Sequence, residues 1–255
     1  VRRTDAGEWL YLHRTLSHAR SLQHEIEARL HATGAGRFTA DQLAAVVPEV
    51  LAATAPPLNR EQALAVCLAL MRRFLVVSGG PGTGKTSIII TLLRCLLALD
   101  VDPGRIRLAA PTGRAAQRIS DSLHAAATAV GDVDPAAVLA GETVHRLLRY
   151  HPGRGRFRYD RNNPLPLDVL VVDEVSMVDA GLMAALLEAV PAAAHVVLLG
   201  DKDQLPSVAA GAVLADLVPP QAVTCVQPQT LARVERLLPQ HDWPAPAAGQ
   251  TPLAA

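Results

Sequence analysis

One short segment has the residue types and the spacing needed to hold a triphosphate. Residues 79–86 read GGPGTGKT, which fits the pattern G-x-x-x-x-G-K-[ST]. Glycines allow a tight loop whose backbone N–H groups face phosphate oxygens, and a following helix turns its positive end toward the same anions. Lys85 would then reach the β- and γ-phosphates, and the Thr86 hydroxyl would hold Mg²⁺. The residues predicted to bind the nucleotide in this loop are Gly80, Pro81, Gly82, Thr83, Gly84, Lys85 and Thr86.

The use of lysine indicates that this loop is functional. Lys85 and Lys202 are the only lysines in the chain, and all of its other long cationic side chains are arginines. A compact ammonium kept in such a sequence indicates a specific need for lysine. An ordinary glycine turn would need neither the lysine nor the apolar segment before it and the helical segment after it.

Two adjacent acids, Asp173 and Glu174, directly follow the apolar run 170–172. Parallel sheets bind ligands beyond the carboxyl ends of their strands, so these acids should meet the phosphate loop there. Asp173 suits Mg²⁺ coordination, directly or through water, and Glu174 suits orienting and deprotonating an attacking water. Taken alone, an Asp-Glu pair after a strand is also a common way to start a loop.

A second polar segment, residues 201–206, follows the apolar run 195–200. Gln204 in this segment could sense the γ-phosphate and pass its presence to a nucleic acid site. A solvated turn closed by Pro206 explains the same residues, so the sequence leaves both interpretations open. The predicted catalytic residues are Lys85, Asp173, Glu174 and Gln204, and the predicted metal ligands are Thr86 and Asp173.

Apolar runs that alternate with helical periodicity predict an α/β fold. Continuous apolar strands of this kind indicate a parallel sheet covered by helices on both faces. The expected strands are residues 74–78, 106–110, 167–173 and 195–200. The expected helices follow the phosphate loop through residue 99 and then cover residues 113–129, 141–150 and 180–190.

Composition shifts divide the chain into three parts. Residues 1–55 predict a small helical segment, with a helix over 9–30 and a second helix from Asp41, a suitable N-cap, to residue 51. After two prolines, residues 56–218 form the predicted α/β domain. Residues 219–255 are rich in Pro, Ala and Gln, which predicts a poorly ordered tail with one weak helix over 231–238. The chain begins with Val1 and not with Met, so we expect the sequence to be trimmed or partial.

Bulk composition limits the classes of partner and compartment. The formal net charge is zero, so any DNA contact must be a local track or be completed by a partner. Cys67, Cys95 and Cys225 are widely spaced, which favours reduced cysteines in a cytoplasmic protein. The apolar runs are too short to cross a membrane, so no membrane association is expected.

Five segments together resemble motifs I, Ia, Ib, II and III of superfamily 1 helicases, in order and in spacing. They are residues 79–86, 110–116, 143–148, 173–179 and 200–208. Within that superfamily the chain is most similar to the RecD family, the alpha subunit of exodeoxyribonuclease V, over residues 8–218. The resemblance implies a RecA-like P-loop NTPase fold and an ATP-dependent DNA helicase with ATP and Mg²⁺ as cofactors. It also implies movement along single-stranded DNA in recombinational repair, with partners resembling the RecB and RecC subunits.

The resemblance also assigns residues by position. It implies that Gln62 lies against the adenine, although Asn59 and Gln62 equally suit the start of a helix. It implies two segments that hold single-stranded DNA, and the first has the free N–H groups and the arginine that suit a phosphate. His145 could also be a polar residue at a helix start, and the arginine-rich residues 154–161 could contact DNA or form a solvated hairpin. The residues implied to contact DNA are Pro111, Thr112, Gly113, Arg114, Thr143 and His145.

The turnover expected of the 255-residue chain is low. Superfamily 1 motors hydrolyse ATP between two RecA-like domains, and the second domain supplies an arginine worth roughly 10³–10⁵ in turnover. No second Walker-like segment is recognisable after Val218. We therefore expect this chain to bind Mg·ATP, hydrolyse it slowly and not translocate alone. A P-loop ATPase with a non-DNA task and an inactive binding remnant are the alternatives, and no nuclease-type metal cluster is recognisable.

Overall fold

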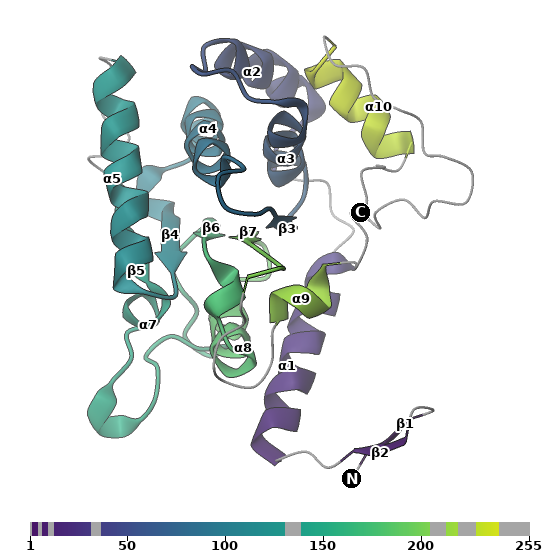
Figure 1. Cartoon of the computed structure of the whole chain (residues 1–255), viewed down its shortest axis with the longest axis vertical. Helices are drawn as coiled ribbons and strands as arrows, with labels where there is room; N and C mark the ends of the chain where they lie inside the picture. Colours follow the sequence, from purple (N-terminus) through teal and green to yellow (C-terminus); the bar gives the residue numbers. More distant parts are fainter. Residues whose placement is uncertain are drawn as a thin grey trace.

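A five-stranded parallel sheet forms the centre of the computed structural model (Figure 1). Its strands lie in the order β3-β7-β6-β4-β5, and every neighbouring pair is parallel. The strands are β3 (Phe74–Ser78), β4 (Ile106–Ala110), β5 (Gly141–Thr143), β6 (Val169–Val172) and β7 (His195–Gly200). The structure describes residues 2–4, 7–9, 13–31, 37–130, 139–204, 213–218 and 228–239.

Alternate residues of the four longer strands, β3, β4, β6 and β7, enter two separate hydrophobic cores. Val169 and Val171 belong to one core, whereas Leu170 and Val172 belong to the other. A strand that is buried on both faces must be apolar at every position, which is why these strands read as continuous apolar runs. The predicted α/β fold with a parallel sheet covered on both faces is therefore confirmed.

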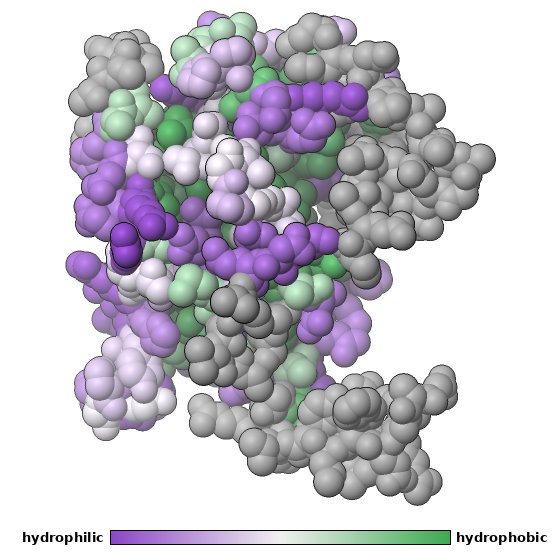
Figure 2. Space-filling model, in the orientation of Figure 1, coloured by the Kyte–Doolittle hydropathy of each residue, from purple (hydrophilic) through white to green (hydrophobic). Residues whose placement is uncertain are grey.

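Helices cover both faces of the sheet (Figure 1). The first core is closed by α2 (Ala40–Ala52), α3 (Arg60–Met71), α4 (Lys85–Ala98), α5 (Gly113–Val130) and α10 (Pro228–Leu237). The second core is closed by α1 (His13–Leu30), α7 (Val144–Leu147), α8 (Ala180–Ala189) and α9 (Val213–Leu217). Figure 2 shows that hydrophobic residues on this side of the molecule are visible chiefly in the recesses between polar surface groups.

The N-terminal helices share these cores with the sheet. Leu22 and Ile26 of α1 are buried in the second core, and Leu43 and Val47 of α2 are buried in the first. The predicted boundary between residues 55 and 56 therefore does not coincide with a break in packing. The helix predicted over 9–30 begins at His13 as α1, and ahead of it the structure has two short antiparallel strands, β1 (Arg2–Thr4) and β2 (Gly7–Trp9), which were not predicted.

A buried arginine joins α1 to the end of α8. The Arg29 side chain is 1% exposed and forms an ion pair with Glu25 at 2.6 Å. Its Nη2 donates to the carbonyl oxygens of Leu187 at 2.7 Å and Val190 at 2.9 Å. The last carbonyls of a helix have no partner within the helix, so Arg29 satisfies groups that would otherwise be buried without a hydrogen bond.

Replacing Arg29 with alanine is expected to lower the free energy of unfolding by about 3–5 kcal/mol. Arg29 is one of two ion-pair partners of the partly buried Glu25, the other being Arg161, and its removal also leaves two buried carbonyls without their donor. Urea unfolding followed by circular dichroism measures the change. Arg20→Ala, an exposed position on the same helix, is the matched control and should change stability by less than about 0.5 kcal/mol. Equal stability of both variants would contradict the role of Arg29.

Three further predictions about elements were wrong in detail. The N-cap of α2 is Thr39, not Asp41, because Thr39 and Gln42 form a reciprocal capping box. Residues 141–150 are not one helix, because residues 141–143 pair with β4 as strand β5 before the short helix α7. The helix predicted over 231–238 in the C-terminal tail is present as α10, but it spans Pro228–Leu237, and its Val234 and Leu237 are buried in the first core. Residues 219–227 and 240–255 of the tail lie outside the described residues.

Two of the three cysteines are buried and free. Cys67 and Cys95 both lie in the first core. Burial raises the pKa of both thiols to about 12, so neither has the character of a reactive thiolate. Cys225 lies outside the described residues. Among the helices that the structure describes, none has the length and apolar character of a membrane span.

Candidate functional site

The phosphate loop connects β3 directly to α4. Gly82 and Gly84 have φ values of 75° and 80°, which is the left-handed region that glycine enters without a steric cost. The Thr83 hydroxyl donates to the Gly80 carbonyl oxygen at 2.8 Å and so closes the loop on itself. The Lys85 ammonium donates to the carbonyl oxygens of Gly79 at 2.5 Å and Gly80 at 2.9 Å. The ammonium therefore lies against the loop whose amides would face a phosphate.

Gln62 supports this loop from α3. Its side chain accepts from the Asn59 N–H at 2.9 Å, and its Nε2 donates to the Thr83 carbonyl oxygen at 2.9 Å. The Asn59 side chain in turn accepts from the Gln62 N–H, which completes a capping box. Gln62 thus caps α3 and contacts the phosphate loop at the same time. Contact with an adenine remains a prediction.

Replacing Gly84 with alanine is expected to disturb this contact and to weaken nucleotide binding. A left-handed φ costs a non-glycine residue about 1–2 kcal/mol, and the new methyl group would collide with the Gln62 amide. We expect Mg·ATP affinity to fall at least about tenfold, measured by titration with a fluorescent ATP analogue. Gly153→Ala is the control, since a methyl group there would meet only His151 at an ordinary 3.5 Å. An unchanged affinity in Gly84→Ala would show that the loop tolerates a side chain.

The acid pair follows β6 with an unusual backbone. Glu174 has a φ of 54°, a left-handed conformation that is rare for a residue with a side chain and that clusters at functional sites. Its N–H donates to the Asp173 carboxylate at 2.8 Å. Burial raises the pKa of Asp173, and the nearby Glu174 charge adds to that rise, while the Glu174 N–H and the charges of Lys85 and Arg118 oppose it. A buried carboxylate of this kind fits a bound cation.

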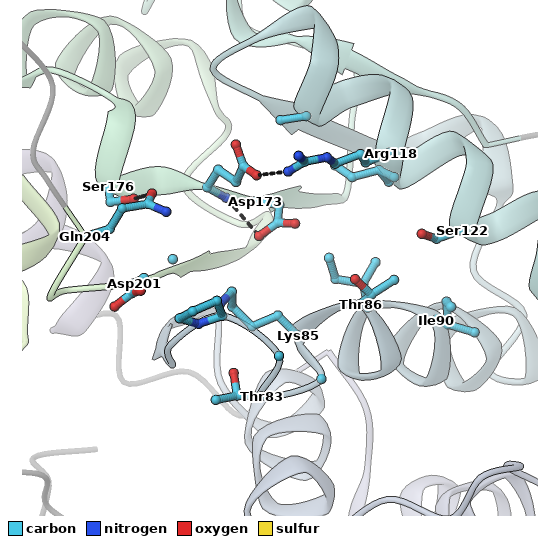
Figure 3. Close-up of a pocket in the computed structure, with 18 of the residues that line it drawn as sticks. Thr83, Lys85, Thr86, Ile90, Arg118, Ser122, Asp173, Ser176, Asp201 and Gln204 are labelled. Carbon is cyan, nitrogen blue, oxygen red and sulfur yellow. Dashed lines mark hydrogen bonds and ion pairs between the residues drawn. The ribbon is translucent and has the colours of Figure 1, made fainter.

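A pocket of about 430 Å³ brings the phosphate loop and the acids together (Figure 3). Sheet order explains this, because only β7 separates the loop strand β3 from the acid strand β6. Thr86 and Asp173, the predicted metal ligands, line the same pocket. Gly80 belongs to the phosphate loop and Gln62 contacts the loop, but neither residue lines the pocket. The predicted site residues that line it are Pro81, Gly82, Thr83, Gly84, Lys85, Thr86, Asp173, Glu174 and Gln204.

The residues present fit a magnesium ion held jointly with phosphates. Mg²⁺ keeps several waters and usually takes one or two carboxylates together with substrate phosphates, so Thr86 and Asp173 are a sufficient protein contribution. Among the residues that the structure describes, no three His, Cys, Asp or Glu side chains form a group that could hold a metal ion by themselves.

Gln204 reaches the pocket from the segment after β7. Its side-chain carbonyl accepts from the Ser176 hydroxyl at 2.9 Å, and Ser176 belongs to the short 3-10 helix η3 (Val175–Met177) that follows the acids. The Gln204 amide nitrogen is then the group available as a donor toward the pocket. Pro206, on which the alternative of a closed turn depends, lies outside the described residues.

The two segments implied to hold DNA lie side by side at one edge of the sheet. Ala110 at the end of β4 pairs in register with Thr143 at the end of β5. The Thr112 hydroxyl accepts from the Ala115 N–H at 3.2 Å, and Thr143 is the N-cap of α7. None of the six implied DNA-contacting residues lines the nucleotide pocket. Pro111, Thr112, Gly113 and Arg114 form the turn into α5.

His145 is part of a ring cluster, not an isolated polar residue. Its imidazole lies 5.8 Å from the ring of Tyr150 and 5.9 Å from that of Phe157, measured between centroids. Phe157 comes from the predicted arginine-rich loop, which is a mostly exposed hairpin closed by the bridges His151↔Arg156 and Asp160↔Asn163. The second segment implied to contact DNA is therefore packed against this hairpin through the rings of His145 and Phe157.

Arg118 is a pocket residue that the sequence did not predict. It projects from α5 and forms an ion pair with Glu174 at 3.1 Å (Figure 3). The two residues are 56 positions apart, so no local pattern could pair them. The available signal was weaker: Arg118 is four residues after Arg114 in a predicted helix, so both lie on one helix face.

Comparison with known proteins agrees with the arrangement of this site. Residues 62–210 match the family described as an AAA domain. The RecBCD enzyme subunit RecD of Mycobacterium tuberculosis is 49% identical over 165 residues, which cover 62% of this chain and 28% of that protein. The ATP-dependent RecD2 DNA helicase of Deinococcus radiodurans is 41% identical over 160 residues, which cover 63% of this chain and 20% of that protein.

The family match extends over the five strands of the sheet and the residues of the pocket. The chain spans about a quarter of the length of the curated relatives it matches. The solved structure of the Pif1 helicase from Candida albicans is 26% identical, covers 60% of this chain and 34% of that chain, and superimposes with a TM-score of 0.38. That score is too low to bear on the fold, which follows from the strand order and the two cores. The chain therefore belongs to the AAA domain family, and its sequence is similar to those of RecD subunits and of the RecD2 helicase.

Proposed function

We propose that this chain is the ATP-binding motor domain of a RecD-like DNA helicase, which couples Mg²⁺-dependent ATP hydrolysis to movement along single-stranded DNA in recombinational repair. The observation that supports it most is the single pocket lined by Lys85, Thr86, Asp173, Glu174 and Gln204. The pocket contains the anion-binding loop, a carboxylate suited to a cation and an acid suited to activating water. The name of one relative, an ATP-dependent DNA helicase, supports DNA as the substrate.

Each polar residue has a separate task in this proposal. The loop amides and Lys85 bind the phosphates, and Thr86 and Asp173 hold Mg²⁺, which neutralises phosphate charge when bound. Glu174 orients the attacking water and takes its proton. The Gln204 amide donates toward the γ-phosphate position. Because Ser176 holds the other end of that amide, Gln204 is tied to the helix that follows the acids.

Single-stranded DNA binds, in this proposal, across the turn into α5 and the start of α7. Thr112, Arg114 and Thr143 offer backbone amides, hydroxyls and a guanidinium to phosphates, and these groups lie on adjacent strand ends. The hairpin beyond His145 adds rings on which bases can stack and several exposed arginines. A local track of this kind is compatible with a formal net charge of zero.

Partner subunits and location are further parts of the proposal. One group of relatives is named as a subunit of the RecBCD enzyme, so partners resembling RecB and RecC are expected for a protein containing this chain. The RecD2 relative is named as a helicase without reference to a complex. A cytoplasmic location follows from a role on chromosomal DNA.

Binding experiments with two ligands test the proposal. Titration with a fluorescent ATP analogue and Mg²⁺ should show saturable binding, and a labelled thymidine oligonucleotide should bind with an affinity that falls as salt rises. Double-stranded DNA of the same length should bind less tightly than the single strand. Nucleotide binding without any binding of single-stranded DNA would favour a P-loop ATPase with another task. The absence of nucleotide binding would contradict the proposed function altogether.

A further inference from the structure

The ion pair between Arg118 and Glu174 connects two regions that have separate tasks. Glu174 follows β6 and is the acid assigned to water activation, whereas Arg118 belongs to α5. Both side chains line the nucleotide pocket, with Arg118 opposite the phosphate loop (Figure 3). For the carboxylate of Glu174, Arg118 is the ion-pair partner in the described part of the chain. The position of the acid therefore depends on α5.

The same helix begins at the turn assigned to DNA. Thr112 bonds to the first turn of α5, and Arg114 is exposed in that turn. Residues four apart on a helix lie on the same face, about 6 Å from each other. Arg118 is four residues after Arg114, so a phosphate held by Arg114 would lie within one helical turn of the guanidinium that holds Glu174. A rigid element thus joins the two sites.

The pair is suited to being broken and remade. The Arg118 side chain is 61% exposed and that of Glu174 is 25% exposed, so water screens their attraction. Solvated ion pairs of this kind contribute little to stability. A purely structural pair would be expected where it is buried, as Arg29 and Glu25 are. An anion in the pocket, or one beside Arg114, can therefore compete with Glu174 for the guanidinium.

We propose that the Arg118–Glu174 ion pair couples the nucleotide pocket to the DNA-binding turn of α5. The guanidinium has five N–H donors, so once it has left Glu174 it can face a triphosphate on one side and a DNA phosphate on the other at the same time. Whichever ligand binds first breaks the ion pair. The free energy needed to break it therefore does not reduce the affinity for the second ligand. Binding is then positively cooperative, and the carboxylate of Glu174 is released to contact water when both ligands are present. This inference rests on the proposed function, because it requires both binding sites.

The coupling factor between the two ligands tests the inference. Affinity for Mg²⁺ with a non-hydrolysable ATP analogue is measured with and without a saturating thymidine oligonucleotide. In the wild-type chain the oligonucleotide should tighten nucleotide binding by about two- to fivefold, the range available from an exposed ion pair, and the reciprocal effect on DNA affinity should be equal. In Arg118→Gln the factor should fall to about one, while each ligand still binds alone.

Additional variants separate the ion pair from a general loss of charge. Glu174→Gln should also reduce the coupling factor to about one, and the double variant should show no further change. Arg118→Lys keeps the charge and should retain part of the coupling. Arg20→Gln removes an exposed charge from α1 and should leave the factor at the wild-type value. Thermal unfolding of each variant confirms that the fold is intact.

The possible results distinguish the inference from the function on which it rests. If the wild-type chain binds both ligands but Arg118→Gln retains the wild-type coupling factor, the inference is wrong and the proposed function stands. A wild-type coupling factor of one, with both ligands bound, would likewise overturn the inference and leave the proposed function standing. If the chain binds neither ligand, both the inference and the proposed function are wrong.

Discussion

Lys85→Ala is expected to lower the affinity of the chain for Mg·ATP by about a hundredfold without unfolding it. The ammonium is the cation of the phosphate loop, and hydrogen bonds to charged groups are worth about 1.5–3 kcal/mol each. A loss of about 3 kcal/mol corresponds to roughly two orders of magnitude in affinity. Titration with a fluorescent ATP analogue measures the change, and urea unfolding verifies that the variant remains folded.

Two further variants make the Lys85 experiment specific. Lys85→Arg retains the charge but offers a planar, larger cation where the loop holds a compact one, so it should also bind the nucleotide poorly. Arg20→Ala removes an exposed cation from α1 and should bind Mg·ATP like the wild type. If Lys85→Ala bound the nucleotide as tightly as the wild type, the phosphates would have to be held elsewhere.

Glu174→Gln is expected to retain nucleotide binding and to lose most of the hydrolysis. A positioned general base contributes about 10²–10⁴ to a rate, and an amide of the same shape cannot accept the proton from water. Because the wild-type chain should turn over slowly, hydrolysis is best followed with the protein in excess over radiolabelled ATP and with single-stranded DNA present. Nucleotide affinity, measured in parallel, should change by less than about threefold, because Glu174 contacts the water and not the phosphates.

The control for this experiment is another acid-to-amide change. Glu235→Gln lies on the exposed side of α10, far from the pocket residues, and should hydrolyse ATP like the wild type. Equal rates for Glu174→Gln and the wild type would mean that another group activates the water. A large loss of affinity in Glu174→Gln would mean instead that the acid binds the nucleotide complex.

The sheet was predictable because burial on both faces leaves a simple pattern. The strands Phe74–Ser78, Ile106–Ala110 and His195–Gly200 have the predicted bounds. Most of their residues alternate between two cores, so most positions are apolar and each run stands out against the helices. Strand β5 was missed because it has three residues, Gly-Glu-Thr, without an apolar run. Its place in the sheet depends on pairing with β4, which is a long-range property.

The sequence predicted the phosphate loop and the acids of the pocket, but it did not predict the Arg118–Glu174 contact within it. The phosphate loop has a fixed spacing set by phosphate geometry, and the rule that ligands bind at strand carboxyl ends placed the acids beside it. The left-handed backbone of Glu174 has no sequence signal, since glycine is the usual residue there. The Arg118 contact joins residues of different elements, so it required the strand order.

The ends of the chain show the limits of composition as a guide. The Pro- and Ala-rich C-terminal segment predicted a poorly ordered tail with one weak helix, and that helix is present as α10, but composition did not predict that Val234 and Leu238 are buried or that the Thr230 hydroxyl accepts from Arg72. The apolar residues of α10 are few but lie on one face, and their burial depends on the surface that α2 and α3 present. The same argument applies to α1, whose Leu22 and Ile26 pack on the second core.

The central claim is that the loop, Lys85 and the acids converge on one metal-bound triphosphate. A crystal structure of the chain with Mg²⁺ and a non-hydrolysable ATP analogue tests it most directly. We expect phosphates within the loop, a Mg²⁺ ion at about 2.1 Å from the Thr86 hydroxyl, and the Asp173 carboxylate bound to that ion directly or through one water. A nucleotide bound elsewhere, or a metal ion out of reach of Asp173, would show that the loop and the acids do not bind one metal-bound triphosphate.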